Sequence, residues 1–273
     1  MNPGEHAVMA QTESRHWWYQ GLRDVVGRTL AHPALALPRS PAILDAGCGT
    51  GETLRFLAAQ LAPRYLGGFD HSAEAIDLAR EKAPEADLYV SDLCDPEIRV
   101  GSLDLVLSLD VVSEAGTEVS RPGLQRLVGC LAPGGLLLLH LPAYGWLFSE
   151  HDVAVHTRER FTLGEVTRLL RALGLEPVRA SYRMTALFPA LVLSRLGSIG
   201  RPPDAQRARS DLHRPPSSMT NALLGAIVSG ENRLVARGLR LPFGSSVLAV
   251  GRKVAGPVGR KSAGGPVGSG GAE

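Results

Sequence analysis

The chain lacks the features that mark several large classes of protein. Its 273 residues carry a net charge of only +2, which gives no electrostatic case for a nucleic-acid partner. The three cysteines are too scattered for a zinc knuckle or a disulfide framework, so we expect no metal site and a cytoplasmic location. Residues 1–15 contain no apolar core of a signal peptide.

Long hydrophobic runs are also missing. The longest apolar stretches, 136–141 and 186–196, are too short to span a bilayer. We therefore expect no transmembrane segment, although the second stretch leaves peripheral membrane contact open.

Glycine, in contrast, is concentrated where a short apolar strand (42–46) is expected to end. Gly47, Gly49 and Gly51 follow that strand directly. A residue without a Cβ lets the backbone approach a ligand at the carboxyl edge of a sheet. Asp70 follows a second apolar run, about 20 positions further on, as expected for a carboxylate that binds ribose hydroxyls. The pair predicts a cofactor that contains a nucleoside.

The spacing of the glycines decides between kinds of nucleoside. A dinucleotide fold uses G-x-G-x-x-G, but Glu52 occupies the third glycine position here. A carboxylate at the start of a helix repels phosphate and suits a cationic or zwitterionic ligand, which argues against a nicotinamide-dependent dehydrogenase. The pattern Asp45-x-Gly-x-Gly-x-Gly resembles the first motif of class I S-adenosylmethionine (SAM) dependent methyltransferases. The resemblance implies SAM as cofactor and S-adenosylhomocysteine (SAH) as product, with the turn under the methionine part.

Strands and helices alternate along the chain, which is typical of a parallel sheet with crossover helices. The methyltransferase resemblance implies a Rossmann-like, seven-stranded sheet in the order 3-2-1-4-5-7-6, with strand 7 antiparallel and helices on both faces. We expect strands at 42–46, 65–69, 88–90, 103–109, 136–141, 177–183 and 246–252.

Beyond this core we predict three additions. Residues 1–13 are expected to be disordered, and the methyltransferase domain (14–253) is expected to begin with a helix at 14–32. About 60 residues separate the last two strands, far more than a hairpin needs. This helical insertion (about 185–243) is interpreted as a lid, or alternatively as a packing appendage or dimer surface. The Gly-rich tail (254–273) is expected to be disordered.

Each residue of the predicted cofactor site has a chemical reason. Asp45 would organise the turn or accept a hydrogen bond from the cofactor ammonium, and Asp70 would accept two from the ribose. Asp92 would accept from the adenine amine beside the backbone N–H of Leu93, and Asp110 faces the methionine end or the substrate. Capping the next helix is the alternative for Asp70, and a loop turn for Asp92. The predicted cofactor-binding residues are Asp45, Gly47, Cys48, Gly49, Gly51, Asp70, His71, Asp92, Leu93 and Asp110.

The segment after the fifth strand combines aromatic residues, histidines and carboxylates. A histidine held by a carboxylate is a good general base for a hydroxyl group near neutral pH. The predicted base is His151, with Asp152 as partner or alternate and His156 as second choice. The spacing matches no specific zinc pattern, so no metal is expected. A purely structural role, with these groups bonded to Arg158 or Arg160, stays open.

Aromatic residues from two segments are candidates for contact with the substrate. Two adjacent tryptophans cannot share one stripe of a helix, so one can anchor the helix while the other covers a pocket. The predicted substrate-binding residues are Trp17, Trp18, Tyr19, Tyr144 and Trp146.

Further motifs resemble one bacterial subgroup of class I methyltransferases, widely of unassigned substrate. The subgroup's R-Y-T reads R-F-T here, so the hydroxyl is absent at Phe161. The matching segments are Glu13-x-x-His16-Trp17-Trp18-Tyr19, Ser149-Glu150-His151-Asp152 with His156, Arg160-Phe161-Thr162, Asn221, Glu231 and Pro242-Phe243-Gly244-x-Ser246.

We therefore predict a biosynthetic enzyme that moves a methyl group from SAM to a small or medium-sized acceptor. The His/Asp candidates favour oxygen as the acceptor atom, and nitrogen or carbon are alternatives. A second alternative keeps the SAM fold but catalyses cyclisation, isomerisation or elimination. The expected partner is a small-molecule substrate, and the chain is expected to be a monomer or homodimer.

Overall fold

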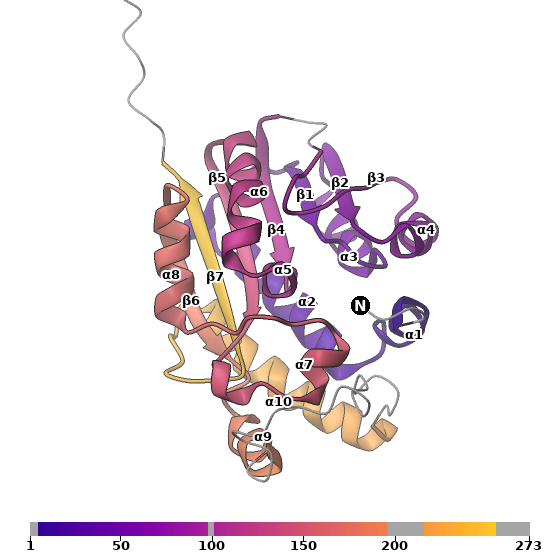
Figure 1. Cartoon of the computed structure of the whole chain (residues 1–273), viewed down its shortest axis with the longest axis vertical. Helices are drawn as coiled ribbons and strands as arrows, with labels where there is room; N and C mark the ends of the chain where they lie inside the picture. Colours follow the sequence, from indigo (N-terminus) through magenta and orange to yellow (C-terminus); the bar gives the residue numbers. More distant parts are fainter. Residues whose placement is uncertain (1–4, 98–100, 196–215, 255–273) are drawn as a thin grey trace, which may run out of the picture.

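The structure, a computed structural model, describes residues 5–97, 101–195 and 216–254. A seven-stranded sheet in the order β3-β2-β1-β4-β5-β7-β6 forms its centre (Figure 1). β7 is antiparallel to both neighbours, and the pairs among β1 to β5 are parallel, which confirms the predicted topology. The strands are β1 (Ala42–Ala46), β2 (Tyr65–Asp70), β3 (Asp87–Val90), β4 (Leu103–Leu109), β5 (Leu131–Pro142), β6 (Leu175–Arg183) and β7 (Ser246–Lys253).

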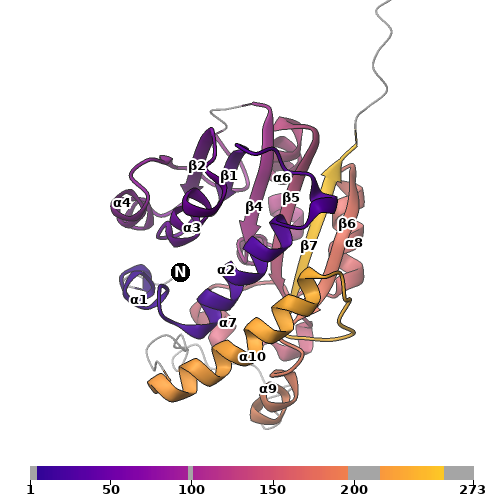
Figure 2. The same ribbon diagram turned by 180° about the vertical axis from the view of Figure 1, so that it is seen from behind.

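Helices cover both faces of the sheet (Figures 1 and 2). α2, α3 and α10 lie on one face, and α6 and α8 lie on the other. The α-helices are α1 (Glu5–Thr12), α2 (Trp17–Leu30), α3 (Glu52–Leu61), α4 (Ala73–Lys82), α5 (Val112–Ala115), α6 (Thr117–Cys130), α7 (Glu150–Ala154), α8 (Leu163–Ala172), α9 (Phe188–Arg195) and α10 (Ser218–Ala236), and the short 3₁₀ helices are η1 (Pro33–Leu35) and η2 (Gly145–Leu147).

The strands are apolar because both faces of the sheet are covered. Successive side chains of a strand point to opposite faces, so Ile43 and Leu44 of β1 enter different apolar cores. Ile43 packs in the core beneath α2 and α3, and Leu44 in the core beneath α6 and α8. All five residues of β1 are buried, which holds the turn that follows it on a rigid support.

The N-terminal segment differs from the prediction. Disorder was expected for residues 1–13, but Glu5–Thr12 form α1, whose side chains Glu5, His6 and Met9 are buried. The predicted helix at 14–32 is α2, which begins only at Trp17 because His16 is its N-cap and accepts a hydrogen bond from the Trp18 N–H. The predicted disordered tail lies outside the described residues, apart from Val254.

The predicted insertion contributes α9 and α10. α10 lies along α2, so two helices about 200 residues apart in the chain cover the same part of the sheet (Figure 2). Gly21 of α2 allows this approach, because a Cβ built there would lie 2.6 Å from Cγ1 of Val228. The Trp17 N–H also donates to Oδ1 of Asn221, at 3.0 Å.

A substitution at this helix crossing tests the packing. Gly21→Ala should lower the free energy of unfolding, because overpacking typically costs about 1–3 kcal/mol and exceeds the roughly 1 kcal/mol that alanine gains in a helix. Val228→Ala in the same chain should restore part of the loss. Urea denaturation followed by circular dichroism measures both. Gly230→Ala in α10 is the control, since its Cβ meets nothing within 4 Å; equal stability changes at positions 21 and 230 would contradict the packing.

Candidate active site

The glycine turn after β1 has the backbone shape that its sequence suggests. Gly47, Gly49 and Gly51 have φ angles of +87°, +54° and +85°, which side chains rarely permit. A Cβ on Gly47 would also lie 2.2 Å from Cγ2 of Val111, and one on Gly51 would lie 2.8 Å from Cα of Ala79. The turn therefore needs glycine both for its conformation and for the close approach of α5 and α4.

Carboxylates gather around this turn because parallel strands end at the same edge of the sheet. Asp45 is in β1, Asp70 ends β2, and Asp110 follows β4. The Asp70 carboxylate accepts the Gly49 N–H through Oδ2 and the Ser72 N–H through Oδ1, both at 3.0 Å. It thereby joins the glycine turn to the end of β2.

Asp70 does not cap α4, which was the alternative reading of its position. Ser72 is the N-cap, and its Oγ accepts a hydrogen bond from the Ala75 N–H. His71 beside it is largely exposed, with Nδ1 3.4 Å from Oδ1 of Asp70. The carboxylate, which faces the turn, remains available for further donors.

The carboxyl edge of the sheet, with Asp45, Asp70, Asp110 and Glu114, is called the crevice below. Two of its carboxyl groups have a pKa near 7. Burial raises the pKa of Asp45 to about 7, and the charge of Asp70 acts in the same direction. Oδ1 of Asp45 is buried and accepts no hydrogen bond from the described part of the chain. Burial likewise raises the pKa of Glu114 in α5 to about 7, with the charges of Asp70 and Asp110 contributing. A cation would relieve this repulsion, so these residues fit a cationic cofactor.

Glu52, the residue that distinguishes this turn from a dinucleotide motif, is already neutralised. Burial would raise its pKa, but hydrogen bonds from Arg55 and the charges of Arg23 and Arg55 outweigh it and lower the pKa. Oε1 of Glu52 lies 2.5 Å from Nη2 of Arg55. The charge of Glu52 is thus balanced within the protein, and the crevice carboxylates carry the attraction for a cation.

Other predicted cofactor residues differ in exposure. Cys48 lies beneath the turn, and burial raises the pKa of its thiol well above the ordinary value. Leu93 is buried, whereas Asp92 is exposed and accepts the Cys94 N–H at 2.8 Å. The Ser91 N–H donates to the Asp70 carbonyl, so the end of β3 lies beside the end of β2. Asp92 is therefore at the crevice edge, with part of its carboxylate used in a loop turn.

The N-terminal segment covers the glycine turn, which the sequence did not predict. Thr50 Oγ1 and Lys82 Nζ both donate to the buried carboxylate of Glu13. A Cβ on Gly49 would lie 3.2 Å from Cε of Met9 in α1. The sequence feature that could have predicted this contact was Glu13, the first residue of the Glu-x-x-His-Trp-Trp-Tyr motif.

The three neighbouring aromatic residues of α2 face different surroundings, as the helix geometry requires. Trp17 lies beside α10, and the Trp18 ring meets the His140 ring edge-on with centroids 6.1 Å apart. Burial raises the pKa of Tyr19 above its ordinary range, and the charges of Glu13 and Asp110 act in the same direction. Tyr19 therefore faces the acidic crevice.

Tyr144 and Trp146 form an aromatic cluster beyond the end of β5. The Tyr144 ring stacks on Trp146 at 5.8 Å and on Tyr182 at 5.1 Å between centroids. Phe188 of α9 contacts both residues, at 5.8 and 6.1 Å. This cluster joins the segment after β5 to the insertion.

The histidine segment forms α7 and the loop that follows it. The Asp152 carboxylate does not serve His151, contrary to the predicted pairing. Its Oδ2 accepts from N and Oγ of Ser149 as part of a capping box, and its Oδ1 pairs with Arg160. Asp152 is 1% exposed, so its geometry supports the structural alternative.

His156 is exposed in the loop that follows α7. Burial lowers the pKa of His156, and the neighbouring His71 and Arg158 charges act in the same direction. The Arg158 and Glu159 N–H groups donate to the Ser113 carbonyl, which places this loop against α5. The crevice rim therefore includes a histidine that is neutral near pH 7, whereas His151 sits half-buried in α7.

Two further residues were missed altogether. His140 of β5 is fully buried, and its Nδ1 lies 2.9 Å from Oδ2 of Asp110. Its Nε2 lies 2.8 Å from Nη1 of Arg183, which ends β6. The sequence signal was a single histidine within the apolar run 136–141.

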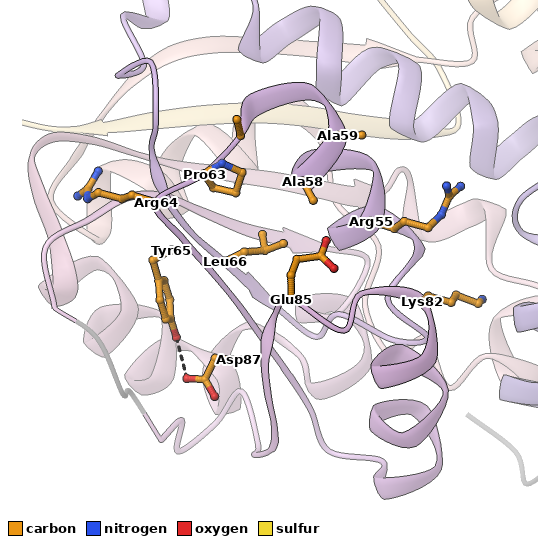
Figure 3. Close-up of a pocket in the computed structure, with 11 residues that line it drawn as sticks. Arg55, Ala58, Ala59, Pro63, Arg64, Tyr65, Leu66, Lys82, Glu85 and Asp87 are labelled. Atoms are coloured by element: carbon orange, nitrogen blue, oxygen red, sulfur yellow. Dashed lines mark hydrogen bonds between the residues drawn. The ribbon is translucent and has the colours of Figure 1, made fainter.

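A surface hollow of about 720 Å³ lies between α3, α4 and the beginning of β2 (Figure 3). Tyr65, the first residue of β2, donates to Asp87 on its wall, at 3.1 Å. The hollow is thus at the amino end of β2, at the opposite end of that strand from Asp70. Its basic residues already have partners: Arg55 pairs with Glu52, and Arg64 pairs with Asp104.

Within residues 5–97, 101–195 and 216–254, no three or more histidine, cysteine or acidic side chains are grouped so that they could hold a metal ion. Over the same residues, no helix has the length and apolar character needed to cross a bilayer.

Comparison with known proteins adds the family. A methyltransferase domain family matches residues 43–135. The trans-aconitate 2-methyltransferase of Paracidovorax citrulli is 33% identical over 116 residues, which are 41% of this chain and 44% of that protein. The tRNA (carboxymethyluridine(34)-5-O)-methyltransferase alkbh8 of Xenopus tropicalis is 30% identical over 115 residues, or 39% and 16% of the two chains. The chain thus spans less than half the length of these two relatives.

Solved structures share the fold over most of the chain. A methyltransferase in complex with the Haloferax volcanii Trm112 activator has a TM-score of 0.56, with 21% identity and coverage of 93% of this chain and 95% of that one. The plantazolicin methyltransferase BpumL in complex with SAH has a TM-score of 0.55, with 17% identity and coverage of 93% and 91%. The family match spans β1, the glycine turn and the three strand-end carboxylates, so residues 43–135 form a methyltransferase domain, and the chain shares the fold of these methyltransferases.

Proposed function

We propose that the crevice binds SAM with its methionine part over the glycine turn. Asp45 would accept from the ammonium group, Asp70 from the ribose hydroxyls, and Asp92 with Leu93 would hold the adenine. The raised pKa of Asp45 carries this proposal, because a buried carboxyl group that meets no donor from the described chain suits a cationic ligand. When bound, SAM supplies an electrophilic methyl group.

The proposed reaction is methyl transfer to a small or medium-sized acceptor, with oxygen as the first choice of acceptor atom. The protein has to align the acceptor with the methyl group and take up a proton. His156 is the better-placed base, because it lies at the crevice rim and its lowered pKa keeps the imidazole neutral near pH 7. His151 remains the second candidate, and Asp152 supports the loop that carries both.

The acidic crevice also bears on the nature of the acceptor. Several of the curated relatives are named for trans-aconitate, a tricarboxylate. Asp110 acts electrostatically on both Tyr19 and Glu114, and the two acidic groups would repel a polyanion. We therefore propose a neutral or cationic acceptor.

Calorimetry with SAH tests the cofactor site. Asp70→Ala should weaken SAH binding about 10- to 100-fold, because hydrogen bonds to a charged group contribute roughly 1.5–3 kcal/mol. Asp77→Ala in α4 is the matched control, since Asp77 is exposed and pairs only with Arg80 among the described residues. The absence of SAH binding by the folded wild-type chain would refute the proposed function.

The pKa of Asp45 predicts a pH dependence with a definite sign. A bound ammonium group stabilises the ionised carboxylate, so SAH affinity should rise as the pH rises through about 7, and binding should release protons. Calorimetry in buffers of different ionisation enthalpy measures that release. Asp45→Asn should weaken SAH binding and reduce the proton release.

The same substitution should stabilise the unliganded protein above pH 7. The folded pKa of about 7 exceeds the ordinary 3.8, so ionisation of Asp45 penalises folding increasingly between these pH values and fully above them. Asp45→Asn removes a penalty on the order of 1–3 kcal/mol. Denaturation at pH 5 and pH 8 checks this, and a variant less stable than wild type at pH 8 would contradict the assignment.

Substitution of the histidines distinguishes the two candidate bases. An acceptor is first found by screening hydroxylated compounds. With this acceptor, His156→Gln should lower the rate of SAH formation by roughly 10²-fold or more. SAH affinity should change less than about threefold, because the glycine turn is untouched. The reverse result, a loss confined to His151→Gln, would move the base to α7.

A further inference from the structure

A line of three polar side chains crosses the sheet face that α2 and α10 cover. It begins at Asp110 after β4, passes through His140 in β5 and ends at Arg183 in β6. The His140 Nδ1 lies 3.0 and 2.9 Å from the two carboxylate oxygens of Asp110, and its Nε2 lies 2.8 Å from Nη1 of Arg183. His140 and Arg183 are 0% and 1% exposed, whereas the Asp110 side chain is 31% exposed.

The arginine determines where the histidine carries its proton. A guanidinium has N–H donors and no acceptor, so Nε2 of His140 must accept a hydrogen bond from Arg183. Burial lowers the pKa of Arg183 only to about 10, and the group stays cationic at neutral pH. His140 is therefore a neutral imidazole with its single proton on Nδ1, and it donates that proton to Asp110.

Arg183 is held from its other side by the covering helices. Its Nη2 donates to the Gly21 carbonyl of α2 at 3.1 Å and lies 3.5 Å from Oδ1 of Asn232 in α10. Asn232 Nδ2 donates in turn to the same carbonyl, at 2.8 Å, and to Asp24 at 3.0 Å. These contacts fix the guanidinium and couple it to the position of both helices.

The other end of the line is strained and clamped. Asp110 has a φ of +63°, a conformation that non-glycine residues adopt at a cost. Its N–H donates to the His140 carbonyl at 2.7 Å, and its own carbonyl accepts from Oγ of Ser113 at 2.6 Å. β4 lies between β1 and β5, so a carboxylate bonded to His140 is turned away from the glycine turn. Part of the Asp110 side chain stays exposed beside this bond and is open to a ligand.

We propose that His140 and Arg183 are positioning residues that hold Asp110 as a fixed anion, which accepts a hydrogen bond from an O–H or N–H group of the methyl acceptor. The identity of the ligand in this inference rests on the proposed function. The arrangement of protons along Asp110, His140 and Arg183 is independent of that function. Asp110 is then a substrate-binding group, and His140 and Arg183 act through it. The acceptor presents a donor at this point, and a carboxylate is excluded there by charge.

Nitrogen NMR of the histidine side chains tests the line without an acceptor. In ¹⁵N-histidine-labelled wild-type protein at pH 7, His140 should show a protonated Nδ1 and an unprotonated Nε2, with His140→Gln assigning the signal. Arg183→Met should mix the two tautomers, because Nε2 loses its donor. Arg179→Met is the matched control from the same strand, since Arg179 bonds the carbonyls at the end of α10. A wild-type His140 protonated on Nε2 would overturn the proposal.

Kinetics with the acceptor identified by screening tests whether Asp110 binds that acceptor. Arg183→Lys, which keeps the charge but loses the fork geometry, should reduce kcat/KM for the acceptor about 10- to 100-fold, and Asp110→Asn at least as much. SAH affinity of Arg183→Lys should stay within about threefold of wild type. Unchanged kcat/KM in either variant would overturn the proposal. Lack of SAH binding by wild type would instead refute the proposed function and leave the NMR result standing.

Discussion

Repulsion between carboxylates at one edge of the sheet is the constraint around which this molecule is arranged. Parallel strands end together, so Asp45, Asp70 and Asp110 meet there, and α5 adds Glu114. Burial penalises the charged form and the neighbouring carboxylates add to this effect, so the pKa values of Asp45 and Glu114 are both raised to about 7. The crevice is therefore less stable empty than with a cation bound, a common compromise between stability and function.

The surrounding structure handles this charge in two ways. Asp70 is stabilised by backbone N–H groups of the turn and the next loop, whereas Asp110 is stabilised by side chains, through His140 and the buried Arg183. Arg183 thus connects the site to the packing of the covering helices. It bonds His140, which holds Asp110, and it also donates to the Gly21 carbonyl of α2.

The parts that the sequence predicted well are those with local signals. The glycine spacing and Asp70 sufficed for the turn, the alternation of strands with helices indicated a parallel sheet, and the family resemblance implied the order of its strands. α1 was missed because Glu13, which fixes it, finds Lys82 only in the folded chain. His140 was missed for the same reason, since its partner is 43 positions away. The structural role of Asp152 also had a local signal, because Ser149-x-x-Asp152 has the spacing of a capping box.

The division of the chain explains why the acceptor is harder to infer than the cofactor. The family match ends at residue 135, just before His140 and the segment that carries His156. Beyond it, the proposed acceptor side is formed by α2, the end of β6 and the insertion, which come from distant parts of the chain and meet through Asn232 and Gly21. A change in the insertion can therefore alter the group presented to the acceptor while the glycine turn stays the same. If Asp110 binds the acceptor as proposed, specificity follows from how the covering helices hold this side chain rather than from the motif that binds the cofactor.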